Sequence, residues 1–340
     1  MSQPMRIGLI GCGGIAHRHI AGYGAVASEL GVVVAACDPR PDTLAVFADR
    51  YGLRHRFASA ADLIASGEVD VLALLTPPAV RSDVIYPALE RGISVLVEKP
   101  FGETLTDARA FVDAATKSTG YLAVNQQLRF MPDVTLAREL LAAGELGEPR
   151  FIAHDQYQNR TRTRGWRAEE ERLEISIFSI HLLDRVRWLA GRAPRAVSAA
   201  TRHWSESVNG ETCTALTIQF EGGGIGTMES NWHSLGLPEC RLRIDGTRGS
   251  FLSRKVEAIA DACEASVQPE AGESRVVDCS RARAFEWCMG ESMRQLLVAV
   301  RDQREPPHSG RDNLETMAIV DAAYLSASRG GALVSIAELG

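Results

Sequence analysis

A glycine-rich turn near the N-terminus combines residue types that bind phosphate groups. An apolar run ends at Ile10, and the turn Gly11-Cys12-Gly13-Gly14-Ile15-Ala16 follows it. Gly11 permits a tight turn, Gly13 lets a pyrophosphate approach the backbone, and the small Ala16 lets the next helix pack closely. The N–H groups at that helix N-terminus would bind phosphate oxygens. The spacing predicts a dinucleotide site; the alternative is a glycine turn without a phosphate ligand.

An acid follows this turn at the distance expected for ribose recognition. Asp38 ends a second β-branched run, about 20 residues beyond the turn. Its carboxylate would accept hydrogen bonds from the ribose 2′-hydroxyl of NAD and repel the 2′-phosphate of NADP. Because of Asp38, NAD is the expected cofactor. Arg40 would instead attract the 2′-phosphate, so NADP is the second candidate. The alternative is a turn acid ahead of Pro39. Cys12, inside the glycine turn, is small and is expected only to pack.

Two later strand ends carry prolines, and one carries a lysine. Thr76-Pro77-Pro78 follows one apolar run, and Glu98-Lys99-Pro100 follows another. Ligands bind at the carboxyl ends of parallel strands, so Lys99 is expected to face a cofactor crevice. There its amine would hydrogen-bond a ribose or a substrate oxygen. The alternative is a surface lysine paired with Glu98.

His181 and Asp184 lie three residues apart in a segment with helical periodicity, 177–189. They therefore share one face of a helix. Imidazole groups commonly exchange protons near neutral pH, which suits general acid–base catalysis. From these residues alone, a structural histidine–acid pair is the better explanation.

The elements around these residues indicate two domains. Strands and helices alternate over the first 125 residues, and the apolar strands predict a parallel sheet covered on both faces. We therefore expect a doubly wound Rossmann domain over residues 1–125. Its strands are expected at 6–10, 32–37, 54–57, 69–75, 94–98 and 122–124, with helices at 43–51, 82–91 and 105–117, the last opened by the capping box Thr104-x-x-Asp107.

Residues 126–340 are expected to form an α+β domain with a large open, mainly antiparallel sheet. A helix is predicted over 128–143, and period-two alternation predicts strands at 151–157, 197–203, 215–220, 225–231 and 241–244. The glycines between 222 and 226 predict a hairpin turn, because no helix follows them. The C-terminal helices, one of them opened by Asp312-x-x-Glu315, can pack back on the first domain.

Composition excludes several classes of protein. The 340 residues carry a net charge of −6, which disfavours nucleic-acid binding. No apolar run approaches the roughly 18 residues of a membrane span, and the first strand starts too early to leave room for a signal peptide. The seven cysteines are scattered and never spaced as CxxC. This pattern suggests a reducing compartment, the cytoplasm, with neither a metal site nor disulfides.

With these motifs in place, the chain resembles the Gfo/Idh/MocA family (glucose–fructose oxidoreductase, inositol dehydrogenase, rhizopine catabolism) over nearly its whole length. Besides the motifs above, the similarity includes Asn125, Arg129-Phe130-x-Pro132, Gly165-Trp166-Arg167, and Arg187 to Gly191. The resemblance implies an NAD(P)-dependent dehydrogenase or reductase of a sugar, a cyclitol or a related small molecule. It also implies a homodimer or homotetramer formed through the exposed face of the second sheet.

The resemblance assigns roles to single residues. Lys99 would contact the nicotinamide ribose and the substrate hydroxyl, His181 would be the general base or acid, and Asp184 would bind substrate or orient the site. These roles require the Lys99 amine and the His181 imidazole to meet at one nicotinamide. The expected cofactor-binding residues are Gly11, Cys12, Gly13, Gly14, Ile15, Asp38, Arg40, Thr76, Pro77, Glu98, Lys99, Asn125, Trp166 and Arg167.

The chain also departs from the family pattern. Ile177 stands where family dehydrogenases commonly carry an Asp, and Arg81 where they often carry a His. Loss of the acid removes a charged partner of the lysine and the histidine. Either Lys99 and His181 suffice for catalysis, or Glu174 supplies the charge from nearby, or redox activity is weak or absent. Ile177 also makes the pocket less polar, which suits a less hydroxylated substrate than a free hexose.

Other polar residues have two explanations each. Arginines 160, 162, 164 and 167 cluster in one loop. They indicate either a solvated or subunit-contact surface, or recognition of a substrate carboxylate or phosphate. His154 and His233 are expected to be ordinary strand histidines, with the pocket as the alternative.

The expected function is hydride transfer between nicotinamide and a secondary alcohol or ketone carbon. Two alternatives stay open: an NAD-binding sensor without redox turnover, and a redox-neutral enzyme that uses NAD transiently.

Overall fold

The computed structural model describes residues 3–160 and 163–340. The chain divides into two compact units: Met1–Gln127 with Phe285–Leu314, and Leu128–Ala284 with Glu315–Gly340. The second domain was expected over residues 126–340, with C-terminal helices that can pack back on the first domain, and Phe285–Leu314 is a segment of that kind. This segment belongs to the first unit.

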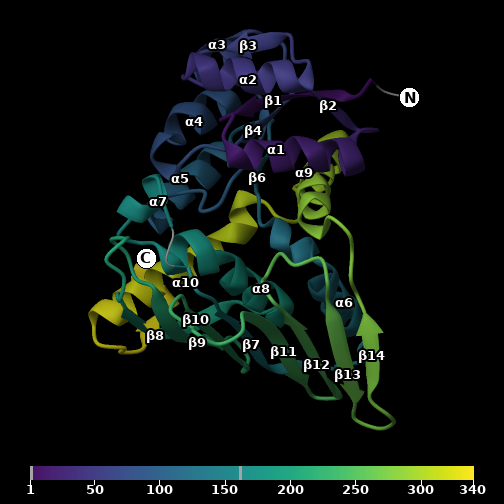
Figure 1. Ribbon diagram of the computed structural model, residues 1–340, viewed down its shortest axis with the longest axis vertical. Helices are drawn as coiled ribbons and strands as arrows, with labels where there is room; N and C mark the ends of the chain where they lie inside the picture. The colour runs from purple at the N-terminus through teal and green to yellow at the C-terminus, as the bar shows by residue number, and fades with distance from the viewer. Residues whose placement is uncertain (1–2, 161–162) are drawn as a thin grey trace. The chain divides into compact units, whose positions relative to one another are not determined.

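The first unit contains a six-stranded parallel sheet in the order β3-β2-β1-β4-β5-β6 (Figure 1). The strands are β1 Met5–Ile10, β2 Gly31–Cys37, β3 His55–Phe57, β4 Val71–Leu74, β5 Ser94–Val97 and β6 Leu122–Val124. Every residue of β4, β5 and β6 is buried, as expected of parallel strands covered on both faces. The order reverses between β1 and β4, where such sheets bind ligands at the carboxyl ends of the strands. The Rossmann prediction is confirmed.

Helices follow most of these strands. They are α1 Gly14–Gly22, α2 Pro41–Tyr51, α3 Ala60–Ala65, α4 Ser82–Glu90, α5 Leu105–Thr116 and, from the C-terminal part, α9 Ala284–Arg301. The capping box of Thr104 and Asp107 opens α5 as predicted. Helices α1 and α9 approach closely through two glycines. A Cβ atom on Gly22 would lie 2.1 Å from the Glu286 carbonyl oxygen, and one on Gly290 would lie 2.2 Å from the Gly22 oxygen.

The second unit contains a nine-stranded sheet in the order β14-β13-β12-β11-β7-β10-β9-β8-β15. Its strands are β7 Pro149–Tyr157, β8 Pro194–Arg202, β9 Cys213–Phe220, β10 Ile225–Asn231, β11 Glu239–Gly246, β12 Gly249–Lys255, β13 Glu264–Pro269, β14 Arg275–Asp278 and β15 Val334–Ser335. Strands β7 and β10 pair in parallel, and the other neighbours pair antiparallel. The predicted mainly antiparallel sheet is confirmed, although β12 to β15 were not predicted individually.

Helix α8, Ile180–Ala190, packs on β7 and β10 and carries both His181 and Asp184. The helix predicted over 177–189 therefore starts later than expected. A π-helical segment, Glu174–Ser179, precedes it and contains Ile177. Helices α6 and α8 lie on the same face of the nine-stranded sheet (Figure 1).

The helix predicted over 128–143 is wrong in its first turn. A 3₁₀ turn covers Gln127–Phe130, and α6 spans Pro132–Ala142. Met131 between them has an extended backbone (φ −60°, ψ 140°). A residue before proline avoids the α-helical region, and proline suits the first helical position, so the helix begins at Pro132.

The last long helix, α10, spans Gly310–Ser328, two residues earlier than its predicted opening at Asp312. The Asp312 N–H donates to the Ser309 hydroxyl at 3.2 Å, so Ser309 fills the capping role that was expected of Asp312.

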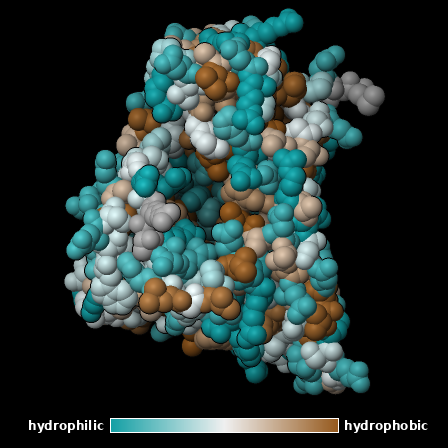
Figure 2. All heavy atoms as spheres, in the orientation of Figure 1, coloured by the Kyte–Doolittle hydropathy of each residue, from teal (hydrophilic) through white to brown (hydrophobic). Residues whose placement is uncertain are grey.

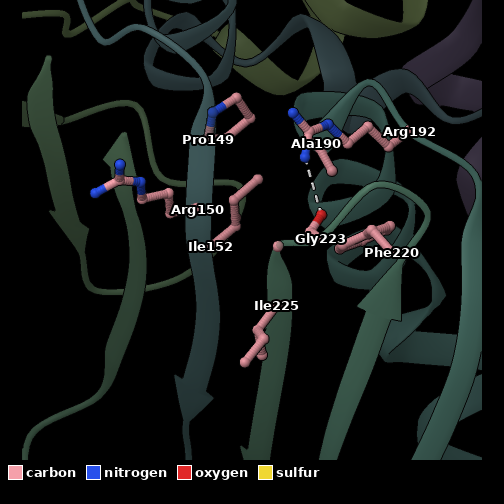
Figure 3. Close-up of a pocket in the computed structure, with 9 residues that line it drawn as sticks. Pro149, Arg150, Ile152, Ala190, Arg192, Phe220, Gly223 and Ile225 are labelled. Atoms are coloured by element: carbon pink, nitrogen blue, oxygen red, sulfur yellow. Dashed lines mark hydrogen bonds between the residues drawn. The ribbon is translucent and has the colours of Figure 1, made fainter. Parts of the chain in front are cut away.

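The glycine-rich hairpin turn is confirmed. Gly222, Gly223 and Gly224 all have positive φ values, and the turn joins the antiparallel strands β9 and β10. Arg192 Nη1 donates to the carbonyl oxygens of Gly222 and Gly223 at 3.2 and 3.0 Å. Figure 3 shows the bond to Gly223. The depression beside this turn has no volume open to a water-sized molecule.

Hydrophilic residues cover most of the face drawn in Figure 2, and hydrophobic residues form small groups among them. Within the described ranges, no helix combines the length and the apolar character that crossing a bilayer requires.

Candidate active site

The glycine turn has the geometry of a phosphate cradle. Gly11 adopts φ +97°, and a Cβ atom there would lie 3.1 Å from the Leu75 carbonyl oxygen, so glycine is required. A Cβ atom on Gly13 or Gly14 would meet nothing within 4 Å. Helix α1 begins at Gly14, and no side chain from the described residues caps its first N–H groups. Open space beside free amides fits the pyrophosphate of a dinucleotide.

Asp38 lies at the carboxyl end of β2, next to this turn. Its Oδ2 accepts a hydrogen bond from the Cys12 amide at 3.0 Å, and its Oδ1 accepts from the Arg40 amide at 3.0 Å. The Arg40 guanidinium also pairs with Asp38, at 3.1 and 3.2 Å. Burial alone would raise the pKa of Asp38, but these hydrogen bonds hold it below its usual value. Asp38 is therefore ionised and fixed against the turn.

Cys12 is 3% exposed, and burial raises its pKa to about 12. Its thiol is therefore protonated and packs in the core, as expected.

The loop after β4 contains polar atoms without partners. Thr76 Oγ1 is buried and has no hydrogen-bond partner within the described part of the chain. Arg81 is 1% exposed; its Nη2 donates to the Thr76 carbonyl oxygen at 2.9 Å, while Nε and Nη1 have no partner among the described residues. Burial lowers the pKa of Arg81 to about 9. In the sequence, Arg81 departs from the family pattern, which often has a His at this position. Its burial could not be predicted from the sequence.

Glu98 anchors a buried network at the carboxyl ends of β5 and β6. Its Oε1 accepts hydrogen bonds from His19 Nε2 at 2.9 Å and from Asn125 Nδ2 at 2.6 Å. His19 Nδ1 lies 2.7 Å from the Tyr23 hydroxyl. Burial alone would raise the pKa of Glu98, but His19, Lys99 and Asn125 lower it to about 2. Asn125 Oδ1 has no partner within the described ranges and is free to accept from a ligand.

Sequence reasoning missed His19. The spacing of His19 and Tyr23 could have indicated their contact, because residues four apart lie on one face of a helix.

Lys99 and His181 come from different units. Lys99 follows β5, is half-buried and precedes a cis peptide bond to Pro100. His181 is 7% exposed and lies in the first turn of α8. That the two groups meet at one nicotinamide stays a prediction.

Asp184 is bound by several donors of the second unit. Arg129 donates to its two oxygens at 2.5 and 2.6 Å, Thr316 Oγ1 donates at 2.8 Å, and Arg187 Nη2 lies 3.4 Å away. The carboxylate is 1% exposed. Of the two roles expected for Asp184, these contacts favour orienting the site.

Ile177 is 4% exposed and packs in an apolar cluster with Leu173, Val208 and Trp232. Glu174, the alternative source of charge, is fully buried and hydrogen-bonded to Ser179. Burial raises the pKa of Glu174, so its surroundings disfavour the charge that it would have to supply.

The loop arginines do not act as one group. Arg160 packs over the rings of Phe178 and Trp232, with distances of 4.9 and 5.8 Å from its guanidinium carbon to the ring centroids. Arg164 and Arg167 are exposed, and Arg167 lies over the ring of Trp166, which starts the short helix α7 Trp166–Glu169. Arg162 lies outside the described residues.

Both strand histidines have partners within the fold. His154 Nδ1 lies 3.0 Å from the Arg241 carbonyl oxygen, and Arg185 donates to its Nε2 at 2.9 Å. His233 Nε2 lies 2.9 Å from Thr212 Oγ1. These contacts support the expectation of ordinary strand histidines. Among the described residues, no three His, Cys, Asp or Glu side chains are arranged to hold a metal ion.

Comparison with known proteins identifies the class. Residues 5–126 match the oxidoreductase family with an NAD-binding Rossmann fold, and residues 134–252 match the GFO/IDH/MocA C-terminal domain. The chain belongs to the GFO/IDH/MocA family. The predicted family, NAD cofactor and oxidoreductase activity are confirmed.

Several characterised relatives are similar over much of their length. The rhizopine catabolism protein MocA of Rhizobium meliloti is 30% identical over 251 residues, covering 72% of this chain and 76% of the relative. A D-apiose dehydrogenase of Paraburkholderia graminis is 26% identical over 347 residues, covering 95% and 87%. The scyllo-inositol 2-dehydrogenase (NAD(+)) of Bacillus subtilis is 28% identical over 261 residues, covering 74% of each chain.

Solved structures show the same fold. An oxidoreductase from Agrobacterium radiobacter, in complex with NAD+, L-tartaric acid and magnesium, superposes with a TM-score of 0.91 at 24% identity, covering 99% of this chain and 100% of that chain. A levoglucosan dehydrogenase with NADH and levoglucosan gives a TM-score of 0.87 at 20% identity, covering 98% and 100%.

Proposed function

We propose that the substrate of this NAD-dependent oxidoreductase is a small polyhydroxylated molecule: a sugar, a cyclitol or a sugar acid. The observation that carries the proposal is the cradle of Gly13 and Gly14 beside the fixed carboxylate of Asp38, in a family whose relatives are named for D-apiose and scyllo-inositol. The reacting group is a secondary alcohol in one direction and a ketone in the other.

Lys99 and His181 carry the chemistry in this proposal. NAD, which the glycine turn and Asp38 would hold, would supply the hydride acceptor for this reaction. During oxidation, His181 removes the hydroxyl proton of the substrate, and Lys99 stabilises the negative charge that develops on that oxygen. During reduction, His181 returns the proton. The support is the placement of Lys99 at the carboxyl end of β5 and of His181 near the start of α8.

Asp184 acts as a positioning residue in this scheme. Its carboxylate is bound by Arg129, Arg187 and Thr316, so its contribution is to fix α8. We assign cofactor contacts to Thr76 and Asn125, whose buried oxygens Oγ1 and Oδ1 have no partners among the described residues. Pro77, Glu98, Trp166 and Arg167 keep their cofactor-binding assignments from sequence.

NAD is favoured over NADP by Asp38. The ionised carboxylate would bind the ribose 2′-hydroxyl and repel a 2′-phosphate. The guanidinium of Arg40 is paired with Asp38, so the positive charge that would bind a 2′-phosphate is offset by the Asp38 carboxylate.

A second candidate, cofactor binding without net redox turnover, is favoured by Ile177. This side chain packs in an apolar cluster where the family pattern commonly has an acid. The cluster gives the active site no carboxylate at this position.

One experiment separates these functions. The purified protein is incubated with NAD or NADH and with D-apiose, scyllo-inositol, D-glucosides, 1,5-anhydro-D-fructose and L-tartrate, while reduced-nicotinamide absorbance and substrate conversion are followed together. A change in absorbance that matches substrate consumed supports the dehydrogenase. Product without net absorbance change indicates the redox-neutral enzyme. Tightly bound cofactor with no product from any substrate indicates the sensor.

The proposal includes a cytoplasmic homodimer or homotetramer assembled through the nine-stranded sheet. All seven cysteines are free thiols, which suits a reducing compartment. Strands β9, β10 and β11 alternate buried residues with intermediate or exposed ones, so one sheet face is available to a second copy. Light scattering coupled to size exclusion tests the assembly, and a monomer would refute it.

A further inference from the structure

Two cysteines of the second unit lie side by side at the edge of the nine-stranded sheet. The Sγ atoms of Cys263 and Cys279 are 2.8 Å apart. A disulfide bond is about 2.05 Å long, so less than 1 Å of movement separates the two sulfurs from bonding distance.

The backbone holds this pair in register. Cys263 immediately precedes β13 and Cys279 immediately follows β14, where Glu264 pairs with Asp278 in an antiparallel ladder. The Cys279 N–H donates to the Cys263 carbonyl oxygen at 3.0 Å. Directly opposite residues of this kind have Cα atoms about 5.5 Å apart, which lies inside the range that disulfides span.

The two thiols differ in exposure and in acidity. Cys263 is 5% exposed, whereas Cys279 is partly exposed. The hydrogen bond between the two thiols lowers the pKa of Cys279, and that same bond and burial raise the pKa of Cys263. Cys279 is therefore the nucleophile, and Cys263 is the thiol positioned to resolve a bond formed there.

Burial lowers the acidity of four of the five other cysteine thiols. Burial raises the pKa of Cys12 to about 12, and that of Cys37 and Cys240 to about 11. Their thiols stay protonated at neutral pH and react slowly. Cys213 is partly exposed, but burial raises its pKa too.

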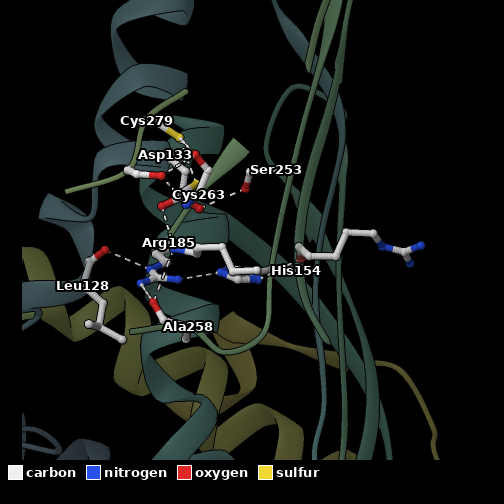
Figure 4. Close-up of polar contacts among 11 residues, drawn as sticks. Leu128, Asp133, His154, Arg185, Ser253, Ala258, Cys263 and Cys279 are labelled. Carbon is white, nitrogen blue, oxygen red and sulfur yellow. Dashed lines mark hydrogen bonds and ion pairs between the residues drawn. The ribbon is translucent and has the colours of Figure 1, made fainter. Parts of the chain in front are cut away.

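A groove leads to the pair. It has a volume of about 680 Å³ and is lined by Cys263 and by Asp278 and Ser280, the two chain neighbours of Cys279, whereas Cys279 itself is not among its lining residues. Figure 4 shows Cys263 and Cys279 beside Asp133. Asp133 forms an ion pair with Lys255 at 2.7 Å and accepts a hydrogen bond from the Ser253 hydroxyl at 2.9 Å. The negative charge of Asp133 near the sulfurs is therefore offset by Lys255. The groove has room for a small-molecule disulfide.

We propose that Cys263 and Cys279 form a thiol–disulfide exchange site, which a small-molecule disulfide of the glutathione type oxidises to an intramolecular disulfide. The Cys279 thiolate attacks one sulfur of the oxidant, forming a mixed disulfide and releasing one thiolate. The Cys263 sulfur then attacks Cys279, forms the internal disulfide and releases the second thiolate, while its proton passes to solvent. Two electrons move from the cysteine pair to the oxidant, and a reducing thiol reverses both steps.

Oxidised glutathione applied to the reduced full-length protein tests this proposal. Thiols are counted after denaturation, and the linkage is mapped by peptide mass spectrometry. The expected result is the loss of two of the seven thiols, a Cys263–Cys279 linked peptide lighter by two hydrogens, and full recovery with dithiothreitol. Thiol counting needs no nicotinamide turnover, so its outcome is independent of the proposed function.

Serine variants assign the order of attack. Cys263→Ser should accumulate a lasting mixed disulfide at Cys279, and Cys279→Ser should react at least about tenfold more slowly than the wild type. Cys213→Ser, which removes the other partly exposed thiol, should behave like the wild type. Circular dichroism checks that each variant is folded. A wild-type protein that keeps all seven thiols, stops at the mixed disulfide, or links other cysteines overturns the proposal.

Discussion

Arg129 binds Asp184 through two short hydrogen bonds, Nε to Oδ2 at 2.5 Å and Nη2 to Oδ1 at 2.6 Å. Arg187 uses the same carboxylate, and the exposed fractions of the three side chains are 2%, 1% and 6% for Arg129, Asp184 and Arg187. Asp184→Ala would leave two buried cations short of a partner. We expect it to lower the free energy of unfolding by about 3–5 kcal/mol, measured by urea denaturation.

A surface pair provides the matched control. Arg275 and Glu145 are also 2.5 Å apart, but their side chains are 47% and 45% exposed. Glu145→Ala should cost less than about 1 kcal/mol, because water screens the pair. Similar losses in the two variants would show that burial does not set the strength of the Asp184 contacts.

The buried carboxylate of Glu98 predicts a pH-dependent stability. Its pKa is lowered from 4.5 to about 2, so its contribution is complete above about pH 4.5 and disappears as pH falls through about 2. The shift corresponds to about 3 kcal/mol at neutral pH, falling to roughly half near pH 3. Glu98→Gln should therefore destabilise the protein most at pH 7. Denaturation of both proteins at several pH values checks this, and a constant difference would rule out the proposed linkage.

Cofactor preference should depend on Asp38. Asp38→Ser removes the charge that repels a 2′-phosphate and frees Arg40 from its ion pair. The ratio of kcat/KM with NADP to kcat/KM with NAD should rise at least about tenfold, which is about 1.4 kcal/mol. The double variant with Arg40→Ala should lose most of that gain. An unchanged ratio in Asp38→Ser would place the ribose recognition elsewhere.

At position 177, a smaller apolar side chain should destabilise the protein less than a charged one. Ile177 is 4% exposed among Leu173, Val208 and Trp232. Ile177→Val should cost about 1 kcal/mol, whereas Ile177→Asp, which buries a carboxylate, should cost about 3 kcal/mol or more. Thermal unfolding of both variants measures the difference. If Ile177→Asp were as stable as Ile177→Val, the site would have polar partners for an acid.

The sequence predicted the Rossmann unit well because its signals are local. The glycine turn, Asp38 and the strand ends follow from backbone conformation and chain order, and the structure places them together. Burial of charged residues was harder to predict. Arg81 and His19 are polar residues on helices or helix ends, and only the tertiary packing buries them.

The second unit shows the same limit. Nothing in the local pattern distinguishes the π-helical turn of Glu174–Ser179 from ordinary helix. Cys263 and Cys279 are 16 residues apart, and their contact depends on the register of a hairpin that was not predicted. Long-range pairing, rather than residue type, determines these features.

The central claim is that Lys99 and His181 perform the hydride-transfer chemistry together. Its most direct test compares steady-state turnover of Lys99→Met and His181→Gln with that of Lys117→Met and His55→Gln, two exposed control positions, on whichever substrate the wild type converts. We expect kcat to fall by about 10²-fold or more in each of the first two variants, with NAD affinity changed far less, and to stay at the wild-type value in the controls. Turnover at the wild-type rate in Lys99→Met or in His181→Gln would contradict the claim.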